Sequence, residues 1–288
     1  MPEILIIGRG FLGSLATDYF GRRAECIGST EVDITSLDSV RKVLGERLPK
    51  VVLNAVAYTG TADLEKPENQ AVGFSLNVQG PANLAIACQE LDIRLVHVST
   101  GMMFDGAGPG NDGWREQDRP EPHIYYAWTK ALADWSLYPY LEANHILVLR
   151  MHLPLSGRYH PKNFLQKLQK FSKVVDVQSS VTVTEDFLTA MDQLLKQEAA
   201  GMYHVVNPGR ISSYQIIELL KDEGVLQADK PVERIGWEEL RVQVEKSGTA
   251  PQVFPILNTD KLQNAGIILP PIEKAIRVRI RQLKESIG

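Results

Sequence analysis

A glycine-rich turn directly after a short apolar run constrains the fold of this chain more than any other feature. Ile4–Ile7 has the pattern of a buried strand, and Gly8-Arg9-Gly10-Phe11-Leu12-Gly13 follows it, after which helical periodicity begins. In such a unit the first glycine permits the turn, the second lets the backbone approach a diphosphate, and the third lets the helix pack on the sheet. The pattern predicts a dinucleotide-binding unit whose turn, residues 8–13, contacts the cofactor, and a glycine turn without ligand is the alternative.

Apolar runs alternate with helical patterns through the first half of the chain. Buried strands are predicted at 4–7, 24–28, 51–53, 94–98 and 146–149, and helices at 11–21, 36–47, 71–91 and 124–141. Strands that alternate with helices form a parallel sheet with helices on both faces, joined by right-handed crossovers. The predicted fold class is therefore α/β, with a doubly wound parallel sheet.

The pattern changes after Arg150. Residues 151–183 contain one convincing helix, at about 163–171, whereas residues 184–207 read as a helix and a strand that return to the sheet. Helices are also predicted at 213–223 and from about 272. We therefore expect a dinucleotide-binding domain of residues 1–150 extended by 184–207, and a smaller substrate-binding domain of residues 151–288 without 184–207, with ligand between them.

Charge and cysteine content exclude several classes of protein. The net charge is −4, which argues against a nucleic-acid surface, and the two cysteines, Cys26 and Cys88, are too few for a disulfide framework. No spacing of His, Cys and carboxylates suggests a metal site, and no apolar stretch reaches the roughly 18 residues that a membrane helix needs. Because there is also no signal peptide, we expect a cytoplasmic protein.

Tyr126 and Lys130 form a Tyr-x-x-x-Lys pair within the helix predicted at 124–141. Residues four apart lie on one face of a helix, so the ammonium is expected beneath the phenol. A nearby cation lowers a tyrosine pKa from about 10 and makes the phenol a better proton donor. Together with the glycine turn, the pair suggests carbonyl reduction with a nicotinamide cofactor. His97, by contrast, lies inside a predicted buried strand and is interpreted as a hydrogen-bonded core histidine.

The choice of nicotinamide cofactor depends on the end of the second strand. An NAD site usually has a carboxylate there, whereas an NADP site has a cation. The strand predicted at 24–28 is followed by Ser29 and Thr30, and Arg9 lies in the first turn, where it could reach a 2′-phosphate. This favours NADPH. NADH stays open because Glu31 and Asp33 are close by.

Several further motifs give the chain a family resemblance. They are Asp33-Ile34-Thr35, Asn54-Ala55-Val56-Ala57-Tyr58-Thr59, Asn77 before Gly80-Pro81, Val98-Ser99-Thr100-Gly101, Phe104-Asp105-Gly106 and Asn258-Thr259-Asp260-Lys261-Leu262. With the tyrosine–lysine pair, they resemble an extended short-chain dehydrogenase/reductase with a Rossmann fold. Within that group the chain is most similar to dTDP-4-dehydrorhamnose reductases and to nucleotide-rhamnose 3,5-epimerase/4-reductases.

The resemblance implies roles for individual residues. Thr100 would hydrogen-bond the substrate carbonyl, Tyr126 would deliver the proton, and Lys130 would bind the nicotinamide ribose. The cofactor would also be lined by Ser29, Asp33, Ile34, Ala55, Ala57, Tyr58, Asn77 and Ser99. The substrate would be a nucleotide sugar, contacted by Thr100, Met102 and Lys167. His152, just past the fifth predicted strand, and Asn163 could also face the sugar ring, with ordinary structural roles as the alternative. Homodimers are common in this family, so a homodimer is an open expectation.

Met102 departs from the bifunctional relatives. In those enzymes a cysteine follows Thr-Gly and acts as an acid/base in epimerisation, but a methionine thioether carries no titratable proton. Lys167 still matches their second epimerisation residue. We therefore expect an NADPH-dependent 4-keto reductase, with a bifunctional epimerase/reductase and a non-catalytic regulatory subunit on the same scaffold as the alternatives.

Overall fold

The computed structural model describes residues 2–141, 146–247 and 252–287, and the chain divides into two compact units. Unit 1 comprises residues 1–103, 119–150 and 191–203. Unit 2 comprises residues 104–118, 151–190 and 204–288. Each unit has its own hydrophobic core, so the two are described separately.

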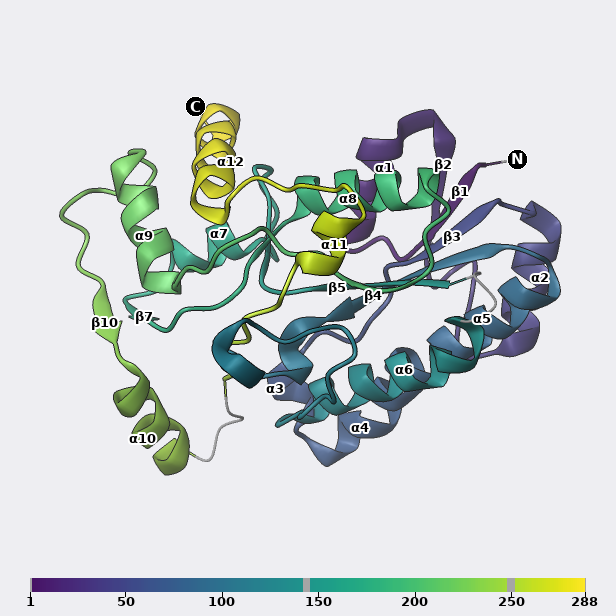
Figure 1. Cartoon of the computed structure of the whole chain (residues 1–288), viewed down its shortest axis with the longest axis horizontal. Helices are drawn as coiled ribbons and strands as arrows, with labels where there is room; N and C mark the ends of the chain where they lie inside the picture. Colours follow the sequence, from purple (N-terminus) through teal and green to yellow (C-terminus); the bar gives the residue numbers. More distant parts are fainter. Residues whose placement is uncertain (1, 142–145, 248–251, 288) are drawn as a thin grey trace. The chain divides into compact units, whose positions relative to one another are not determined.

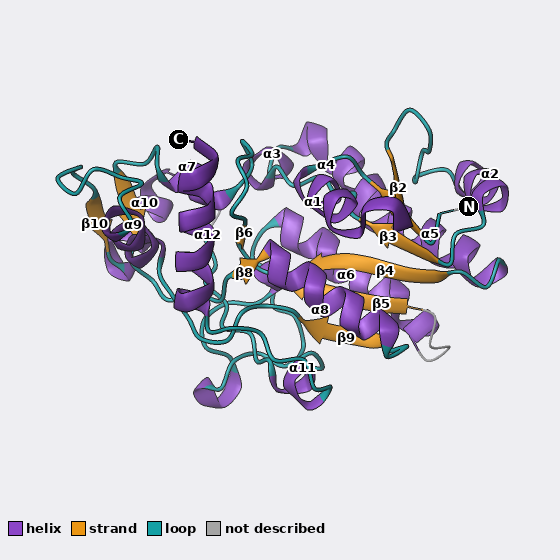
Figure 2. Cartoon of the chain, turned by 90° about the horizontal axis from the view of Figure 1, so that it is seen from above, coloured by secondary structure: helices purple, strands orange, loops and turns teal. Residues whose placement is uncertain are grey.

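A six-stranded sheet forms the centre of unit 1 (Figure 2). Its strands, in spatial order, are β2 (Ala24–Ile27), β1 (Ile4–Ile7), β3 (Val51–Asn54), β4 (Arg94–Thr100), β5 (Ile146–Met151) and β9 (Gly201–His204). The pairs β1–β2, β1–β3 and β3–β4 are parallel. Because β1 lies between β2 and β3, the strand order reverses between β1 and β3, and this reversal is the switch point of a doubly wound sheet.

Helices cover both faces of this sheet, as predicted (Figure 1). α1 (Phe11–Phe20) lies on one face, and α2 (Leu37–Arg47), α5 (Gly80–Glu90) and α6 (Tyr125–Leu141) lie side by side on the other. α2 begins where Ser36 caps it, since the Ser36 hydroxyl accepts from the Ser39 N–H. The α/β class with a parallel Rossmann-type sheet is confirmed.

The helix predicted at 71–91 is longer and less regular than its periodicity suggested. It starts at α4 (Pro67–Phe74), which follows the short α3 (Thr61–Leu64), and passes through a π-helical turn at Ser75–Gln79 before α5. Pro67 begins α4 because a proline at the first helical position lacks only an N–H that would be unpaired there anyway. The π turn changes the phase of the helix, which a fixed 3.6-residue pattern does not anticipate.

Unit 2 consists of short strands and helices around a second core. Its helices are α7 (Phe164–Leu168), the start of α8 (Thr184–Lys196), α9 (Ser213–Asp222), α10 (Trp237–Ser247), α11 (Asp260–Asn264) and α12 (Ile272–Ile287). Two small parallel pairs join β6 (Pro154–Leu155) to β8 (Thr182–Val183) and β7 (Lys173–Val175) to β10 (Glu233–Ile235). The helices predicted at about 163–171, at the start of 184–207, at 213–223 and from about 272 are all present, and each begins at the predicted residue or one residue later.

Residues 104–118 belong to unit 2, although the sequence placed them in the first domain. Trp114 explains the difference. Its indole stacks on Phe104, its backbone N–H donates to the Ile256 carbonyl at 2.8 Å, and it forms a β-bridge with Leu257. The sequence also predicts that residues 184–207 extend the dinucleotide-binding domain, whereas only residues 191–203 belong to unit 1. The contacts that decide both boundaries connect residues far apart in sequence.

Among the residues that the structure describes, no helix combines the length and the apolar composition that a bilayer-spanning segment would need.

Candidate functional site

The three glycines of the first turn have three distinct local geometries. Gly8 has φ +115°, which favours glycine, and a Cβ there would lie 3.0 Å from the Ala55 carbonyl carbon. Gly10, at the start of α1, faces open space. A Cβ on Gly13 would lie 1.8 Å from the Gly8 carbonyl oxygen, so only glycine lets α1 pack this closely.

This turn lies at the switch point of the sheet. The Gly8 N–H donates to Ile27 of β2 at 2.8 Å, and the Ala55 N–H donates to Ile7 of β1 at 2.9 Å. The residue after β1 and the residue after β3 are thus held side by side. The start of α1 carries no side-chain cap, and a helix N-terminus favours an anionic group. These observations fit a dinucleotide diphosphate.

Arg9 is ion-paired in this structure. Its guanidinium donates to the Glu31 carboxylate, with one bond of 3.0 Å, and its aliphatic part lies against Gly28. Glu31 also accepts from the Gly28 N–H and the Thr30 hydroxyl, and these bonds, the one from Arg9 first, lower the pKa of the carboxyl to about 2. The end of β2 therefore carries an acid as well as a cation. The sequence left NADH open because Glu31 lies close to Arg9, and this ion pair weakens the argument for NADPH over NADH.

The loop after β3 is held by Asn77. The Tyr58 N–H donates to Asn77 Oδ1 at 2.7 Å, and Asn77 Nδ2 donates to the Tyr58 carbonyl and to the Thr129 hydroxyl. Asn77 is fully buried, which argues against the direct cofactor contact predicted for it. Its bonds support the loop that carries Ala55, Ala57 and Tyr58, all of which are half-buried.

The other predicted cofactor residues differ in exposure. Ser29 and Asp33 are exposed, and Asp33 Oδ1 accepts from the Thr35 N–H and hydroxyl just before α2. Ile34 is buried against Gly80, Phe11 is buried, and Leu12 is half-buried. The Ser99 hydroxyl is buried and has no hydrogen-bond partner among the described residues. Their contacts with a cofactor stay predictions.

Thr100, Tyr126 and Lys130 converge at the carboxyl end of β4. Lys130 Nζ donates to the Val98 carbonyl at 2.8 Å, and the Thr100 hydroxyl acts on the Tyr126 phenol by lowering its pKa. Thr100 and Val98 lie two residues apart on a strand, about 6.6 Å, and Tyr126 and Lys130 lie four apart on a helix, about 6 Å. This match lets α6 present both side chains to β4.

The pKa of Tyr126 moves in the opposite direction from the prediction. Burial raises it to about 12, the charge of Asp134 adds to the rise, and the bond to Thr100 opposes it. Burial lowers the pKa of Lys130 to about 8, against the opposing effect of Asp134. The predicted stabilisation of phenolate by Lys130 is wrong for this state because removal from water outweighs charge attraction. The phenol keeps its proton at neutral pH.

Four further residues of unit 1 have the following surroundings. His97 is fully buried and both ring nitrogens are hydrogen-bonded, so it is a core histidine, as predicted. Cys88 is a buried thiol whose pKa is raised by burial. The Met102 N–H donates to the Thr100 hydroxyl at 3.2 Å, and the Met102 side chain is half-buried. Trp128, on α6, is 47% exposed.

The predicted substrate residues of unit 2 have different surroundings. Both nitrogens of the buried His152 have no hydrogen-bond partner among the described residues, and burial lowers its pKa to about 3. Asn163 caps α7 and bonds the backbone of Ser156 and Arg158, so its amide is fully used within the fold. Lys167 is exposed on α7. Nothing in the bonding of Asn163 supports its predicted substrate contact.

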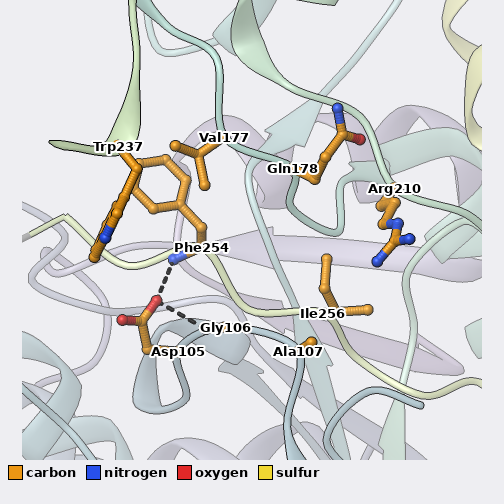
Figure 3. Close-up of a pocket in the computed structure, with 9 residues that line it drawn as sticks. All are labelled: Asp105, Gly106, Ala107, Val177, Gln178, Arg210, Trp237, Phe254 and Ile256. Carbon is orange, nitrogen blue, oxygen red and sulfur yellow. Dashed lines mark hydrogen bonds between the residues drawn. The ribbon is translucent and has the colours of Figure 1, made fainter. Parts of the chain in front are cut away.

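Unit 2 also contains a pocket of 270 Å³ that the sequence analysis missed (Figure 3). Trp237 and Phe254 form an aromatic pair on one side, with ring centroids 6.2 Å apart, and Gln178 and Arg210 lie on the other. Asp105 holds the rim, since its carboxylate accepts from the N–H groups of Phe254 and Gly106. The remaining lining residues are Ala107, Val177 and Ile256. The sequence motif Phe104-Asp105-Gly106 supplies two of the lining residues, Asp105 and Gly106.

Comparison with known proteins gives a single family. The family model described as "RmlD substrate binding domain" matches residues 2–284. The chain is 30% identical over 224 residues to dTDP-4-dehydrorhamnose reductase of Streptomyces griseus, covering 72% of this chain and 71% of that protein. It is 26% identical over 295 residues to a protein of Acanthamoeba polyphaga mimivirus, with 99% of both chains covered.

A plant relative is much longer. The chain is 30% identical over 242 residues to the trifunctional UDP-glucose 4,6-dehydratase/UDP-4-keto-6-deoxy-D-glucose 3,5-epimerase/UDP-4-keto-L-rhamnose-reductase of Arabidopsis thaliana. The match covers 76% of this chain but 34% of that protein. The chain thus spans about a third of this relative.

Solved structures share the fold. The crystal structure of the mimivirus UDP-rhamnose synthase has a TM-score of 0.87 at 23% identity and covers 98% of this chain and 100% of that one. The dTDP-4-dehydrorhamnose reductase of Bacillus anthracis, in complex with NADP, has a TM-score of 0.82 at 21% identity, with 96% and 97% covered.

Proposed function

The chain belongs to the RmlD substrate binding domain family, and from this premise we propose that it reduces the 4-keto group of a nucleotide-activated deoxysugar with NADPH. The observation that carries the proposal is the convergence of Tyr126 and Lys130, four residues apart on α6, with Thr100 at the carboxyl end of β4. The names of the relatives support the substrate class: the Streptomyces protein is a dTDP-4-dehydrorhamnose reductase, and the mimivirus structure is a UDP-rhamnose synthase.

In this proposal Tyr126 is the general acid. A reduced nicotinamide, when bound, supplies the hydride. The carbonyl oxygen gains negative charge as its carbon is reduced, and the Tyr126 hydroxyl donates the proton. Because burial keeps Tyr126 protonated, the acid form is present at neutral pH. The Thr100 hydroxyl is a second donor for that oxygen, and Lys130 binds a ribose hydroxyl.

The residues of the first turn fit the cofactor. Gly8, Gly10 and Gly13 allow a diphosphate to approach the start of α1, and Arg9 offers a cation for a 2′-phosphate once its bond to Glu31 is exchanged. The NADP-bound Bacillus enzyme supports this choice. NADH binding stays open because Glu31 can accept from a ribose hydroxyl.

We infer that the nucleotide part of the substrate occupies the pocket of unit 2. Trp237 and Phe254 offer aromatic surface for a base, Gln178 offers an amide for its polar edge, and Arg210 offers a cation for phosphate. A pocket with mostly apolar walls and few polar groups is typical of small-molecule sites. The two free cysteines, Cys26 and Cys88, are consistent with work in the cytoplasm.

Met102 argues against the bifunctional alternative. Epimerisation beside the carbonyl needs a group that takes and returns a proton, and a thioether does neither. The presence of Thr100, Tyr126 and Lys130 together argues against a purely regulatory subunit, which has no need of a proton donor.

One experiment tests these statements together. The purified chain is mixed with NADPH and UDP- or dTDP-linked 4-keto-6-deoxyhexoses in heavy water, and cofactor oxidation is followed at 340 nm. We expect turnover, and a product without deuterium on the carbons beside C4. Deuterium at those carbons would show that epimerisation survives without the cysteine, and absence of turnover with every sugar would contradict the reductase.

A further inference from the structure

A continuous chain of hydrogen bonds runs beneath the tyrosine–lysine pair, entirely within unit 1. Asn54 Nδ2, at the end of β3, lies 3.1 Å from His97 Nδ1 on β4. His97 Nε2 lies 3.0 Å from Lys130 Nζ, which also donates to the Val98 carbonyl at 2.8 Å. Asn54 and His97 are fully buried and Lys130 is 1% exposed, so water does not compete for these bonds.

Asn54 sets the polarity of this chain. The Val56 N–H donates to Asn54 Oδ1 at 3.0 Å, which fixes the carboxamide so that its NH₂ group faces His97. His97 Nδ1 must therefore accept, and a neutral imidazole then carries its proton on Nε2. That Nε2–H points at Lys130 Nζ, where only an unprotonated amine has a lone pair to accept it. A charged ammonium would instead place donors against each other at one of the two contacts.

We propose that His97 is a positioning residue that donates to the neutral amine form of Lys130 in the cofactor-free protein, favours that form, and thereby lowers the pH at which Lys130 gains its charge. The pKa directions agree. Burial lowers the pKa of His97 well below its usual range, so the imidazole stays neutral. Burial also lowers the pKa of Lys130 to about 8.

Other charged groups around α6 do not reverse this polarity. On α6 itself, Asp134 raises the pKa of Lys130, but its carboxylate also accepts from the Arg150 guanidinium of β5 at 2.8 Å. Besides His97, the titratable and charged residues on the elements packed against α6 are Asp63, Glu68, Cys88, Glu90 and Arg94. Burial raises the pKa of the Cys88 thiol, which stays neutral, and each of the others bonds elsewhere or lies at the surface. In this proposal His97 favours the neutral amine of Lys130, whereas Asp134 favours the charged form.

The histidine tautomer in the cofactor-free protein is the direct test. In protein labelled with ¹⁵N-histidine, the His97 signals are assigned by their loss in His97→Gln. We expect a neutral imidazole with its proton on Nε2 at pH 9, where Lys130 is mostly uncharged, and a ¹³Cε titration of Lys130 with a midpoint near 8. A proton on Nδ1, or a Lys130 midpoint at the usual value of about 10.4, would overturn the proposal.

Two variants separate polarity from charge. Asn54→Asp offers an acceptor to Nδ1–H and should move the His97 proton to Nδ1, whereas Asn54→Ala removes the amide donor without adding a charge. In both we expect the Lys130 midpoint to rise by at least one pH unit. A rise in Asn54→Asp alone would show that charge, rather than bond polarity, controls Lys130, and would refute the proposal.

The kinetic consequence rests on the proposed function, but the spectroscopic test does not. Because kcat/KM reports the pKa values of free enzyme, its alkaline limb should move upward in both Asn54 variants by the same interval as the Lys130 midpoint. An unchanged limb, with shifted midpoints, would remove the link between Lys130 charge and turnover. If no sugar nucleotide is reduced at all, the proposed function is wrong. The tautomer measurement still tests the role of His97, because it uses the cofactor-free protein and needs no turnover.

Discussion

At the residue scale, the end of β2 carries two opposed signals for cofactor choice. Arg9 is suited to a 2′-phosphate and Glu31 to a ribose hydroxyl, and in this structure each satisfies the other. An exposed ion pair contributes little to stability, so the pair can open at small cost when a phosphate replaces the carboxylate as partner of Arg9. Cofactor preference then depends on the balance between these two side chains.

Exchanging either side chain should therefore shift that balance. Arg9→Ala should weaken NADPH binding about tenfold or more, since a charge-assisted bond to phosphate is lost, and should change NADH binding little. Glu31→Gln should tighten NADPH and weaken NADH. Dissociation constants from nicotinamide fluorescence check this, and equal effects on the two cofactors would contradict the assignment of these residues to the ribose site.

His152 makes stability depend on pH. Its pKa is about 3 in the folded protein and about 6.5 when unfolded, so between these values the unfolded chain binds more protons. The free energy of unfolding should fall as pH drops below 6.5, by up to about 1.4 kcal/mol per pH unit for this group. His97 acts in the same direction. Urea unfolding at pH 7.5, 6 and 5 should give a shallower decline for His152→Leu, and identical slopes would refute this account.

Residue types that carry their own geometric constraint could be predicted from the sequence. Gly8, Gly10 and Gly13, and the Tyr126–Lys130 spacing, gave the correct local arrangements. The direction of the Tyr126 pKa could not be predicted, because it depends on burial by residues far away in sequence. For the same reason the roles of Asn54 and Asn77 became apparent only from their hydrogen bonds.

At the element scale, two glycines at the start of α1, Gly10 and Gly13, have different surroundings. Gly13→Ala should destabilise the protein by about 1–3 kcal/mol, because the added methyl meets the Gly8 carbonyl oxygen. Gly10→Ala should change stability by less than about 1 kcal/mol, since nothing lies near its methyl, but should weaken NADPH binding at least tenfold. Urea unfolding and nicotinamide fluorescence separate the two effects. A Gly10→Ala protein with normal NADPH affinity would place the diphosphate elsewhere.

Long periodic elements could be predicted, and short ones could not. The strands β1, β3 and β4 and helix α2 agree with their apolar patterns, because burial on the sheet imposes those patterns. β6 and β8 have two residues each, too few to show any period. The π turn at Ser75–Gln79 interrupts an otherwise regular pattern and has no composition signal of its own.

At the scale of the whole molecule, one family model covers nearly the full chain, yet the two units are interleaved in sequence. The boundary after Arg150 follows from the end of the strand–helix alternation. The transfer of residues 104–118 to unit 2 depends on Trp114 and on chain near 256–257, about 140 residues later, which no local pattern reports. The pocket between Trp237 and Arg210 escaped prediction for the same reason.

The central claim is that Tyr126 gives a proton to a sugar carbonyl at a site that binds NADPH independently of that hydroxyl. The most direct measurement compares wild type and Tyr126→Phe for kcat with a 4-keto-6-deoxyhexose nucleotide and for the NADPH dissociation constant. The account predicts that kcat falls by about 10² to 10⁴, because the proton donor is lost, while NADPH affinity stays within about twofold. A variant that turns over at nearly the wild-type rate would contradict it.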